Sequence, residues 1–528
     1  MDAPANAPAV LDPSRVQRRL FGALRDAHSQ FGGQKQILVD GDGRVFTYDE
    51  LIRGAFALGH ALKRGTKKGD AVAVMLPTSA GAVITFFALT AYGRVPAMLN
   101  FTAGAASLKS ALAAAQMTRI ITAHRFIKLA KLEDLIAALS DVAEVVYLED
   151  VRKKLSPLDK VAAVVGPRLP FVYEQRTSPN APGAILFTSG TEGMPKGVVL
   201  SHANILANVE QVRQHIELFP TDVLMNPLPT FHCFGLTVGA LMPLYLGIKT
   251  VLHPTPLQPH EIVERVRELG VTILLSTDTF MSQYARAGDQ GDLNSLRLAV
   301  CGAERLRDET RQLLRRKYNI ELLEGYGVTE AAPVIAANQV GANKLGTVGH
   351  LVPGMEYRLE VVEGIPNAGR LIVRGPNVML GYLKPDLPGQ IQPPPEGWYD
   401  TGDVVSIDKD GFISIRGRMK RFAKIGGETV SLAVVENCAS ALWPEFSHAA
   451  IILPDGRKGE QIVLVTTAPH AERVAFIAWA QNHGVPELAV PRRIVQMQNI
   501  PVLGTGKTDY TSVQKDAAEA LGSTGTSG

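Results

Sequence analysis

From Phe46 onward, stretches with helical periodicity alternate with short apolar runs. TYDELIRGAFALGHALKR (47–64) has apolar residues at helical spacing, whereas AVAVML (71–76), FFALTAYGR (86–94) and VPAML (95–99) are short apolar runs of the kind found in buried strands. Alternating helices and buried strands are typical of parallel sheets that are covered by helices. We therefore predict an α/β fold built from layered sheets.

The same alternation continues in the middle of the chain. Between residues 203 and 327 the predicted helices are ANILANVEQVRQHIEL and PHEIVERVRELG, and the predicted strands are TVLH, VTILLS, LRLAVCG and IELLEGYG. The last two strands run directly into glycine. The parallel α/β arrangement is thus expected to extend over more than half of the chain.

Beyond about residue 346 the pattern changes. EYRLEVV, GRLIVRG and GFISIRG are short alternating strands between turn residues, which indicates a small antiparallel β unit. After RGRMKRFAK (416–424), mixed helical and strand patterns follow over about a hundred residues, enough for a separate α+β domain. The predicted parts are a disordered leader at 1–20, a large N-terminal domain at 21–417 with a β-rich subdomain at about 346–417, a small C-terminal domain at 418–518 and a flexible tail at 519–528.

Charge and cysteine content exclude several classes of protein. A net charge of +3 over 528 residues, without a basic tail, gives no sign of nucleic-acid binding. Cys233, Cys301 and Cys438 are too far apart for a disulfide framework or a zinc motif, and they fit a reducing cytoplasm. The Ala/Pro-rich start lacks the basic and apolar regions of a signal peptide.

One apolar segment tests the expectation of a protein without membrane spans. FHCFGLTVGALMPLYLGI (231–248) contains no charged residue and is long enough to be a transmembrane candidate. His232, Pro243 and three glycines interrupt it, and no second span accompanies it. We therefore expect a buried core helix and no transmembrane segment.

A glycine-rich loop is the first candidate ligand site. FTSGTEGMPKG (187–197) combines three glycines with the hydroxyl groups of Thr188, Ser189 and Thr191, and Lys196 adds a positive charge. Such a loop can turn its backbone N–H groups toward a polyphosphate. It does not match the kinase-type motif G-x-x-x-x-G-K-[ST], because Gly197 follows the lysine.

Four further segments carry potential chemistry. GYGVTE (325–330) ends in a threonine and a glutamate, a pair suited to a phosphate oxygen and its Mg²⁺. YDTGD (399–403) ends in an aspartate that could accept hydrogen bonds from both hydroxyls of a ribose. RGRMKRFAKIGGE (416–428) has five basic residues before a Gly-Gly pair, and LGTGK (503–507) presents one lysine near the C-terminus. Each segment alone is a weak signal.

The order of these five motifs resembles the adenylate-forming superfamily, which includes acyl-CoA synthetases, luciferases and the adenylation domains of peptide synthetases. The resemblance extends over residues 21–518. It implies a large N-terminal domain and a small, mobile C-terminal domain. It also implies a reaction in which a carboxylate attacks the α-phosphate of ATP, forming an acyl-adenylate and pyrophosphate, after which a thiol displaces AMP.

The resemblance assigns a role to each motif. Thr329 is expected at the α-phosphate, and Glu330 is expected to hold Mg²⁺. Residues expected at the other phosphates are Thr188, Ser189, Gly190, Thr191, Glu192, Gly193 and Lys196. Adenine is expected between Tyr326 with Gly327 on one side and Gly302, Ala303 and Glu304 on the other, and the ribose is expected at Asp403 and Arg418.

The resemblance also implies roles for the C-terminal part. Lys507 corresponds to the catalytic lysine, whose ammonium group stabilises charge between the carboxylate and the α-phosphate. Lys420 occupies the hinge position between the two domains. Gly426 and Gly427 would face the pantetheine thiol in the second half-reaction.

The acyl group is expected beside the apolar segment. His232 falls where the family has a gate or substrate-side residue, although a structural histidine in an apolar wall is an equal alternative. The uncharged run that starts at Gly235 would form one wall of an acyl tunnel. This favours a medium- or long-chain fatty acid as substrate.

Two departures from the superfamily pattern point to a subgroup. Glu192 replaces a threonine, and Arg421 replaces an aspartate. These and neighbouring segments resemble the acyl-[acyl-carrier-protein] synthetase half of the bifunctional 2-acylglycerophosphoethanolamine acyltransferase/acyl-ACP synthetases. None of the histidines begins the His-x-x-x-x-Asp signature of the acyltransferase half. Basic residues around Arg421 would meet the acidic carrier protein, unless Arg421 only pairs with a nearby carboxylate.

The sequence thus predicts an ATP- and Mg²⁺-dependent ligase that activates a fatty acid and transfers it to the phosphopantetheine of holo-acyl carrier protein. The first alternative is a ligase that uses CoA as the acceptor. A non-catalytic nucleotide- or acyl-binding module is the alternative from another class, and the retained Lys507 argues against it. We expect a cytoplasmic protein and leave peripheral contact with the inner face of the membrane open.

Overall fold

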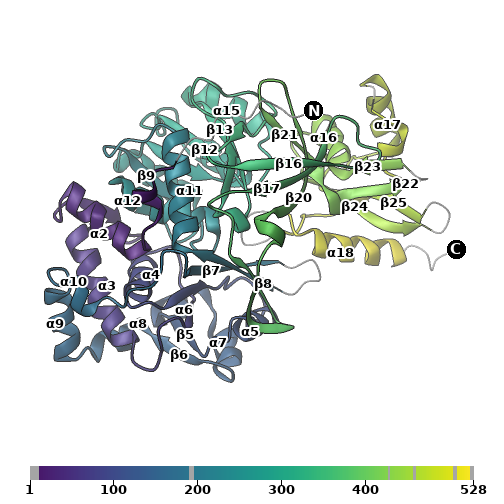
Figure 1. Cartoon of the computed structure of the whole chain (residues 1–528). Helices are drawn as coiled ribbons and strands as arrows, with labels where there is room; N and C mark the ends of the chain where they lie inside the picture. The colour runs from purple at the N-terminus through teal and green to yellow at the C-terminus, as the bar shows by residue number, and fades with distance from the viewer. Residues whose placement is uncertain are drawn as a thin grey trace. The chain divides into compact units, whose positions relative to one another are not determined.

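The computed structural model describes residues 11–189, 195–425, 428–455, 459–483, 485–502 and 508–523. The chain divides into two compact units (Figure 1). Unit 1 comprises Met1–Asn343, Gly349–Glu356 and Arg374–Tyr399, and unit 2 comprises Lys344–Val348, Tyr357–Val373 and Asp400–Gly528. The limits predicted for the leader, the two domains and the tail stay predictions.

The first large sheet of unit 1 has the strand order β19-β18-β8-β7-β4-β3-β5-β6 within the described residues. Strands β3 to β7 pair in parallel, and β7, β8, β18 and β19 pair with one another antiparallel. Their bounds are β3 Ala71–Val74, β4 Val95–Met98, β5 Arg119–Thr122, β6 Glu144–Tyr147, β7 Pro182–Ser189, β8 Pro195–Ser201, β18 Gly381–Lys384 and β19 Leu387–Gln392.

The second large sheet of unit 1 has the order β15-β14-β13-β12-β11-β9-β10-β1-β2. Its central strands, from β13 to β1, pair in parallel. The bounds are β1 Gln36–Val39, β2 Val45–Thr47, β9 Val223–Asn226, β10 Lys249–Leu252, β11 Ile273–Ser276, β12 Leu298–Cys301, β13 Leu322–Gly327, β14 Val334–Ala337 and β15 His350–Leu351.

Helices cover both faces of these sheets (Figure 1). The helices of unit 1 are α1 Pro13–Val16, α2 Leu20–Phe31, α3 Tyr48–Leu62, α4 Ala80–Ala91, α5 Ala105–Ala114, α6 His124–Ala130, α7 Glu133–Ser140, α8 Leu148–Lys153, α9 Pro157–Val165, α10 Pro170–Tyr173, α11 His202–His215, α12 Met242–Leu246, α13 Pro259–Glu268, α14 Asp278–Ala287 and α15 Asp308–Tyr318, with the π-helix η1 Phe234–Leu241 and the 3-10 turns η2 Thr329–Ala331 and η3 Pro395–Gly397.

Side chains of the parallel strands alternate between two cores, which explains why these strands lack a polar face. In β3 and the residue after it, Val72 and Val74 join the core that includes α2, α3 and α4, whereas Ala73 and Met75 join the core that includes α5, α6 and α7. Successive strand residues point to opposite faces, so both sets must be apolar when both faces are covered. The predicted layered α/β fold is confirmed.

Two apolar segments test predictions made from the sequence, and the first of these predictions is wrong. The run at 86–94 is not a strand, because residues up to Ala91 form the end of α4. Ten of the twelve residues of α4 are buried, so the helix is apolar on all sides and its periodicity is hidden. Residues 231–248 lie in the core of unit 1, as predicted, and form η1 and α12. In the described part of the chain, no helix is long and apolar enough to cross a membrane.

Unit 2 contains two smaller sheets. One has the order β16-β17-β20-β21 and the other the order β23-β22-β25-β24, with β26 paired to β25. The strands are β16 Glu356–Val361, β17 Gly369–Arg374, β20 Tyr399–Ile407, β21 Ile413–Arg418, β22 Phe422–Ile425, β23 Glu428–Ser431, β24 His448–Asp455, β25 Gly459–Thr466 and β26 Arg493–Gln496. The second sheet packs on helices, which are α16 Leu432–Leu442, α17 Arg473–Asn482 and α18 Tyr510–Ser523, with the turns η4 Met419–Arg421 and η5 Glu487–Ala489.

Candidate active site

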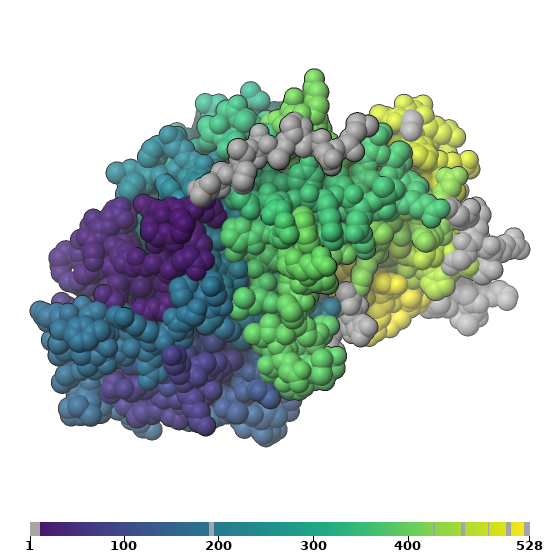
Figure 2. All heavy atoms as spheres, in the orientation of Figure 1, coloured from purple at the N-terminus to yellow at the C-terminus, as the bar shows by residue number. Residues whose placement is uncertain are grey.

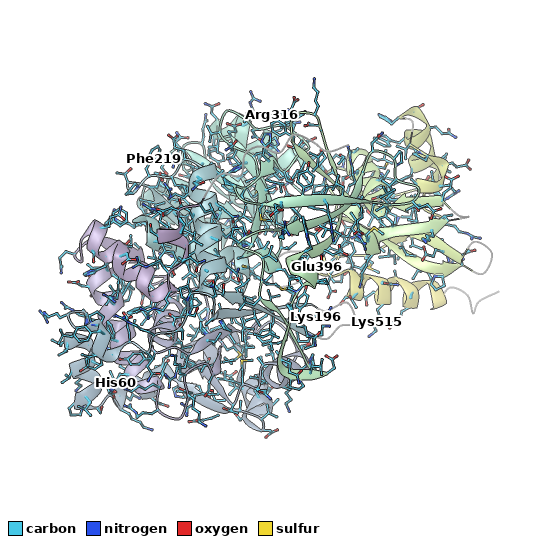
Figure 3. All side chains as sticks on the ribbon, viewed as in Figure 1. His60, Lys196, Phe219, Arg316, Glu396 and Lys515 are labelled. Atoms are coloured by element: carbon cyan, nitrogen blue, oxygen red, sulfur yellow. The ribbon has the colours of Figure 1, made fainter. Side chains whose placement is uncertain are left out.

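The glycine-rich loop joins two antiparallel strands of unit 1. Strands β7 and β8 pair so that Thr188 lies opposite Lys196. This pairing places Lys196, the lysine expected to bind phosphate, beside the start of the loop. Figure 3 labels its position. Gly190, Thr191, Glu192 and Gly193 lie outside the described residues, as does the side chain of Ser189. Their predicted contacts with phosphate stay predictions.

Lys196 and Glu330 are linked through Tyr382. The ammonium group of Lys196 lies 5.4 Å from the centre of the Tyr382 ring, and the Tyr382 hydroxyl donates a hydrogen bond of 2.6 Å to Oε1 of Glu330. Tyr382 is on β18, which pairs antiparallel with β8. The sheet therefore brings Lys196 and Tyr382 together, and Glu330 reaches Tyr382 from η2, which follows β13 of the other large sheet.

Tyr382 and Tyr399 were not found by sequence reasoning. The hydroxyl of Tyr399 lies 3.4 Å from that of Tyr382, and burial raises the pKa of Tyr399, which the nearby Glu330 carboxylate raises further. Tyr399 opens the YDTGD segment and Tyr382 lies in GYLK, but neither belongs to a pattern that indicates chemistry by itself. Only the packing of the folded chain reveals that they meet Glu330.

Thr329 and Glu330 form the first two residues of η2, directly after β13. The backbone oxygen of Glu330 accepts a hydrogen bond from Met379, and its side chain is 8% exposed. Gly327 must be glycine here, because a Cβ atom would lie 2.1 Å from the carbonyl oxygen of Pro333. The carboxylate of Glu330 beside the hydroxyl of Thr329 suits Mg²⁺, because protein-bound Mg²⁺ is commonly coordinated by one or two carboxylates together with substrate phosphates.

The predicted adenine-binding residues lie at the ends of adjacent parallel strands. Cys301, the last residue of β12, pairs with Glu324 of β13, so Gly302 and Ala303 follow one strand beside Tyr326 and Gly327 of the other. All four line the same cavity. Glu304 does not line it, and its carboxylate accepts hydrogen bonds from the backbone and hydroxyl of Thr279 at 3.1 and 3.0 Å.

The side chains that line this cavity are mostly apolar. It has a volume of about 100 Å³ and lies within unit 1 between η1 and the ends of β11, β12 and β13. Phe234, Val238 and Met242, from η1 and the start of α12, line one wall. The uncharged segment thus contributes side chains to a cavity beside the adenine-binding strands.

A buried carboxyl group also lines the cavity. Burial raises the pKa of Glu324 to about 7, although a hydrogen bond from the backbone of Leu306 and the charge of Arg311, 3.6 Å away, act in the opposite direction. Sequence reasoning missed Glu324 because its segment, LLEGYG, was taken as a strand followed by glycines. A carboxyl group inside a mostly apolar run is the signal that could have identified it.

His232 and Gly235 lie next to the cavity wall without lining it. The ring of His232 contacts that of Phe231, with centroids 4.6 Å apart. A Cβ atom on Gly235 would lie 2.3 Å from the carbonyl oxygen of Pro229, so glycine is needed for η1 to start this close to the preceding loop. Their predicted roles in acyl binding stay predictions.

In unit 2, the two predicted ribose-binding residues are in contact. Asp403 on β20 lies opposite Arg418 on β21, and Nε of Arg418 donates a hydrogen bond of 2.9 Å to its carboxylate. The carboxylate is nearly buried, at 3% exposure, whereas the arginine is 63% exposed. Strand register thus places the pair together, and its contact with a ribose stays a prediction.

The basic segment after β21 is partly engaged within unit 2. Arg421 donates a hydrogen bond of 2.7 Å to Glu436, and its guanidinium lies 3.5 Å from the centre of the Tyr510 ring. The alternative that Arg421 pairs with a nearby carboxylate therefore matches the structure. Lys420 lies in η4 beside it, and its hinge role stays a prediction. Gly426, Gly427 and Lys507 lie outside the described residues.

Comparison with known proteins identifies the family. The family model described as "AMP-binding enzyme" matches residues 24–383, which is more than half of the chain. The chain belongs to the AMP-binding enzyme family. The match includes all of the candidate site residues of unit 1 described above up to Tyr382.

Related proteins in this family are named as CoA ligases. A medium-chain fatty-acid–CoA ligase of Escherichia coli K12 is 28% identical, over 92% of this chain and 88% of its own length. A long-chain-fatty-acid–CoA ligase of Salmonella typhimurium is 27% identical, over 96% of this chain and 95% of its own length. A feruloyl-CoA synthase of an Amycolatopsis species is 29% identical, over 88% and 92%.

The fold is shared with solved structures. ATP-bound MatB from Rhodopseudomonas palustris superposes with a TM-score of 0.82 at 24% identity, covering 96% of this chain and 99% of that one. The anthranilate CoA ligase AuaEII in complex with anthranoyl-AMP gives a TM-score of 0.79 at 22% identity, over 96% and 98%. These similarities confirm the predicted fold class.

Proposed function

We propose that this protein is an AMP-forming fatty acid–CoA ligase. The observation that carries the proposal is the apolar cavity whose lining includes the glycines and tyrosine of the GYG segment, three residues before Glu330. A mostly apolar cavity of this kind suits an acyl chain, because apolar ligand groups bind in pockets lined predominantly by apolar side chains. The fatty-acid ligases among the relatives support the same substrate class.

The site residues supply binding, orientation and charge. Lys196 and the hydroxyl of Thr188 would hold the outer phosphates of ATP, and Thr329 would contact the α-phosphate. Bound Mg²⁺ would neutralise phosphate charge, with Glu330 as its ligand and the Tyr382 hydroxyl fixing the carboxylate. Lys507 would stabilise the charge that develops as the fatty acid carboxylate attacks the α-phosphate, because a positioned cation acts most strongly on the transition state.

CoA is favoured over acyl carrier protein as the acceptor. The relatives described above are CoA ligases and a CoA synthase, so the comparisons support the alternative and not the leading prediction. The structure also weakens the argument for the carrier protein, since Arg421 is 20% exposed and paired with Glu436. The Glu436 carboxylate compensates the charge of Arg421, which weakens its attraction for an acidic partner.

The test measures which thiol is acylated. Purified protein with ATP and Mg²⁺ receives labelled medium- or long-chain fatty acid, together with CoA or, separately, holo-acyl carrier protein. We expect acyl-CoA and AMP to form far faster than acylated carrier protein. Faster acylation of the carrier protein would overturn the choice of acceptor while leaving the adenylation chemistry in place.

A lysine variant separates catalysis from binding. Lys507→Ala should lower the rate of pyrophosphate release by more than about 100-fold, the usual range for removing a charge that acts in the transition state. ATP binding, measured by calorimetry, should change little. Unchanged pyrophosphate release would contradict the role of Lys507, and ATP binding without AMP formation in the unaltered protein would favour the non-catalytic module.

A further inference from the structure

Helices α9 and α10 of unit 1 present an apolar outer face. Six large apolar side chains between residues 158 and 172 are exposed, from 43% for Leu169 to 67% for Leu158. We call them the α9–α10 apolar face, which consists of Leu158, Val161, Val164, Leu169, Phe171 and Val172. A soluble helix normally turns charged residues outward, and grouped apolar side chains of this size mark a surface that binds something.

The exposed charges within this segment are all of one sign. Between residues 151 and 176, every exposed charged side chain is basic, namely Arg152, Lys153, Lys154, Lys160, Arg168 and Arg176. The segment has two acidic residues, Asp159 and Glu174, and both are buried. The outer surface of the segment therefore combines apolar side chains with basic ones, and Asp150, at the start of the preceding helix α8, compensates part of the charge of Lys153 and Lys154.

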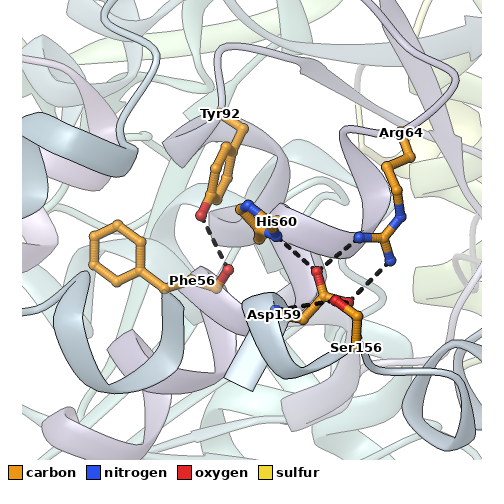
Figure 4. A network of polar contacts seen from close by, with 6 residues as sticks. All are labelled: Phe56, His60, Arg64, Tyr92, Ser156 and Asp159. Carbon is orange, nitrogen blue, oxygen red and sulfur yellow. Dashed lines mark hydrogen bonds and ion pairs between the residues drawn. The ribbon is translucent and has the colours of Figure 1, made fainter. Parts of the chain in front are cut away.

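The inner side of α9 is fixed to the rest of unit 1 by Asp159 (Figure 4). Its carboxylate accepts hydrogen bonds from Arg64 at 2.8 and 3.0 Å, contacts His60 at 2.6 Å, and accepts another from the Ser156 hydroxyl at 2.8 Å. Ser156 and Asp159 also form the capping box that starts α9. One buried carboxylate thus fixes the helix in rotation and leaves the apolar face pointing outward.

The end of α10 is held in the same way. Glu174 accepts hydrogen bonds from Arg19 at 2.9 Å and Arg25 at 2.6 Å. The ring of Tyr173 packs edge-on against Phe56 and His60. In Figure 1, α9 and α10 lie at the outer left edge of unit 1, and in Figure 2 the blue spheres of this part of the chain form that edge of the visible face. The segment is therefore both well anchored and accessible.

We propose that the α9–α10 apolar face docks unit 1 onto the surface of an anionic lipid bilayer. Amphipathic helices of this type lie in the interface, with apolar side chains among the acyl chains and basic side chains at the phosphate groups. Long Lys and Arg side chains can reach the headgroups while the apolar face is inserted. The proposal rests on exposed side chains and charge, and it does not depend on the proposed ligase activity.

A bilayer fits this surface better than a second copy of the chain. A two-fold contact through the face would bring the basic residues of two copies of the segment together, because the same patch is used twice. Like charges placed opposite each other oppose such a contact. An acidic protein would satisfy the basic residues, but it would have to cover six unpaired apolar side chains as well. Anionic lipid supplies both kinds of contact at once.

The experiment measures flotation of the full-length protein with lipid vesicles. Vesicles of phosphatidylcholine alone are compared with vesicles of phosphatidylcholine and phosphatidylglycerol, without ATP or fatty acid. We expect binding to the anionic vesicles, weak binding to the neutral ones and weaker binding at high salt. Failure of the unaltered protein to float with anionic vesicles would overturn the proposal, whatever its ligase activity.

Two pairs of variants locate the docking surface. Phe171→Ser with Val172→Ser should lower vesicle binding about tenfold by removing inserted side chains. Leu257→Ser is the control, since Leu257 is 69% exposed and lies outside the face. Equal loss in both variants would show that the face is not the docking surface.

Charge reversal gives the second pair. Lys153→Glu with Lys154→Glu should lower binding to anionic vesicles at least tenfold, since one basic residue near such a surface contributes about fivefold. The control is Arg315→Glu with Arg316→Glu, which changes net charge equally at the end of another helix. Arg316 lies far from His60, the residue beneath α9, in Figure 3. If both charge reversals lower vesicle binding equally, the binding depends only on the net charge of the protein, and the proposal is wrong.

One further outcome would name a different partner. If the unaltered protein is a dimer by light scattering, and Phe171→Ser with Val172→Ser makes it a monomer, the face is a contact between copies. Binding to an acidic protein such as holo-acyl carrier protein, lost in the same variant and without vesicle binding, would assign the face to a protein partner. Either result would overturn the bilayer proposal.

Discussion

At the scale of single residues, the site depends on polar groups that hold one another in place. Glu330 is nearly buried, and a hydrogen bond from a neutral tyrosine keeps its carboxylate oriented. A carboxylate without that bond could rotate away from a bound cation. Mutating a residue that orients a metal-binding side chain commonly lowers the affinity for the metal or the activity of the enzyme.

Tyr382→Phe tests this contact. The variant removes the 2.6 Å hydrogen bond and keeps the ring beside Lys196. Because a hydrogen bond to a charged group contributes about 1.5–3 kcal/mol, the Mg²⁺ concentration needed for half-maximal pyrophosphate release should rise about 10- to 100-fold. The measurement is pyrophosphate release at varied Mg²⁺ and saturating ATP.

Tyr245→Phe is the matched control for that variant. The Tyr245 hydroxyl is buried and has no hydrogen-bond partner among the described residues, so its removal should leave the Mg²⁺ dependence unchanged. A similar Mg²⁺ dependence in both variants would show that Tyr382 does not position Glu330.

At the scale of secondary-structure elements, η1 shapes the cavity wall. A π-helix is wider than an α-helix and is uncommon outside functional sites. Here it spans eight residues without a charge and places Phe234 and Val238 against the cavity. The alternation of sheet residues in β11, β12 and β13 supplies the opposite wall. The size of the accepted acyl group should therefore depend on side chains of η1.

Val238→Phe and Val238→Ala change the cavity in opposite directions. The phenylalanine should fill part of the cavity of about 100 Å³ and lower kcat/KM for long-chain acids at least tenfold relative to shorter ones. The alanine should shift the preference toward longer chains, by about fourfold for each additional CH₂ that becomes buried. The measurement is kcat/KM over a series of saturated fatty acids. Parallel changes for every chain length in both variants would exclude Val238 from chain-length selection.

At the scale of the whole molecule, buried neutral histidines link stability to pH. His202 is 1% exposed, and burial lowers its pKa to about 4, with the nearby Arg19 charge acting in the same direction. Its Nδ1 accepts a hydrogen bond from the backbone N–H of Leu20, and its Nε2 lies 3.1 Å from the hydroxyl oxygen of Thr177. Burial also lowers the pKa of His215, His253 and His448.

The sign of the pH effect follows from His202. Its folded-state pKa lies below the ordinary value of about 6.5. The contribution of the neutral ring to the free energy of unfolding is therefore fully present above about pH 6.5 and is lost as the pH falls toward 4. Between pH 8 and pH 5, His202 alone should lower the free energy of unfolding by about 2 kcal/mol. Urea unfolding at the two pH values measures the difference. His202→Gln should reduce it, and an identical pH dependence in the variant would contradict the assignment.

The sequence by itself determined the layered α/β architecture and the family resemblance, and it named candidate site residues whose roles stay predictions. Local patterns carry this information because periodicity reports which faces are buried, and motifs such as GYGVTE keep their chemistry within a few residues. Helices that are buried on all sides, such as α4, escape the same reasoning, because the period disappears when every position is apolar.

Only the tertiary structure decided which distant residues meet. Packing of one sheet against the other brought Tyr382 to Glu330, strand pairing brought Arg418 to Asp403, and the position of β13 placed Glu324 at the wall of an apolar cavity. Packing also decided that Asp159 and Glu174 are buried, which leaves the surface of α9 and α10 purely basic and apolar. The physical reason is that strand register and burial are set by the whole chain, so a contact between separate elements, such as that of Tyr382 in β18 with Glu330 in η2, has no local signature.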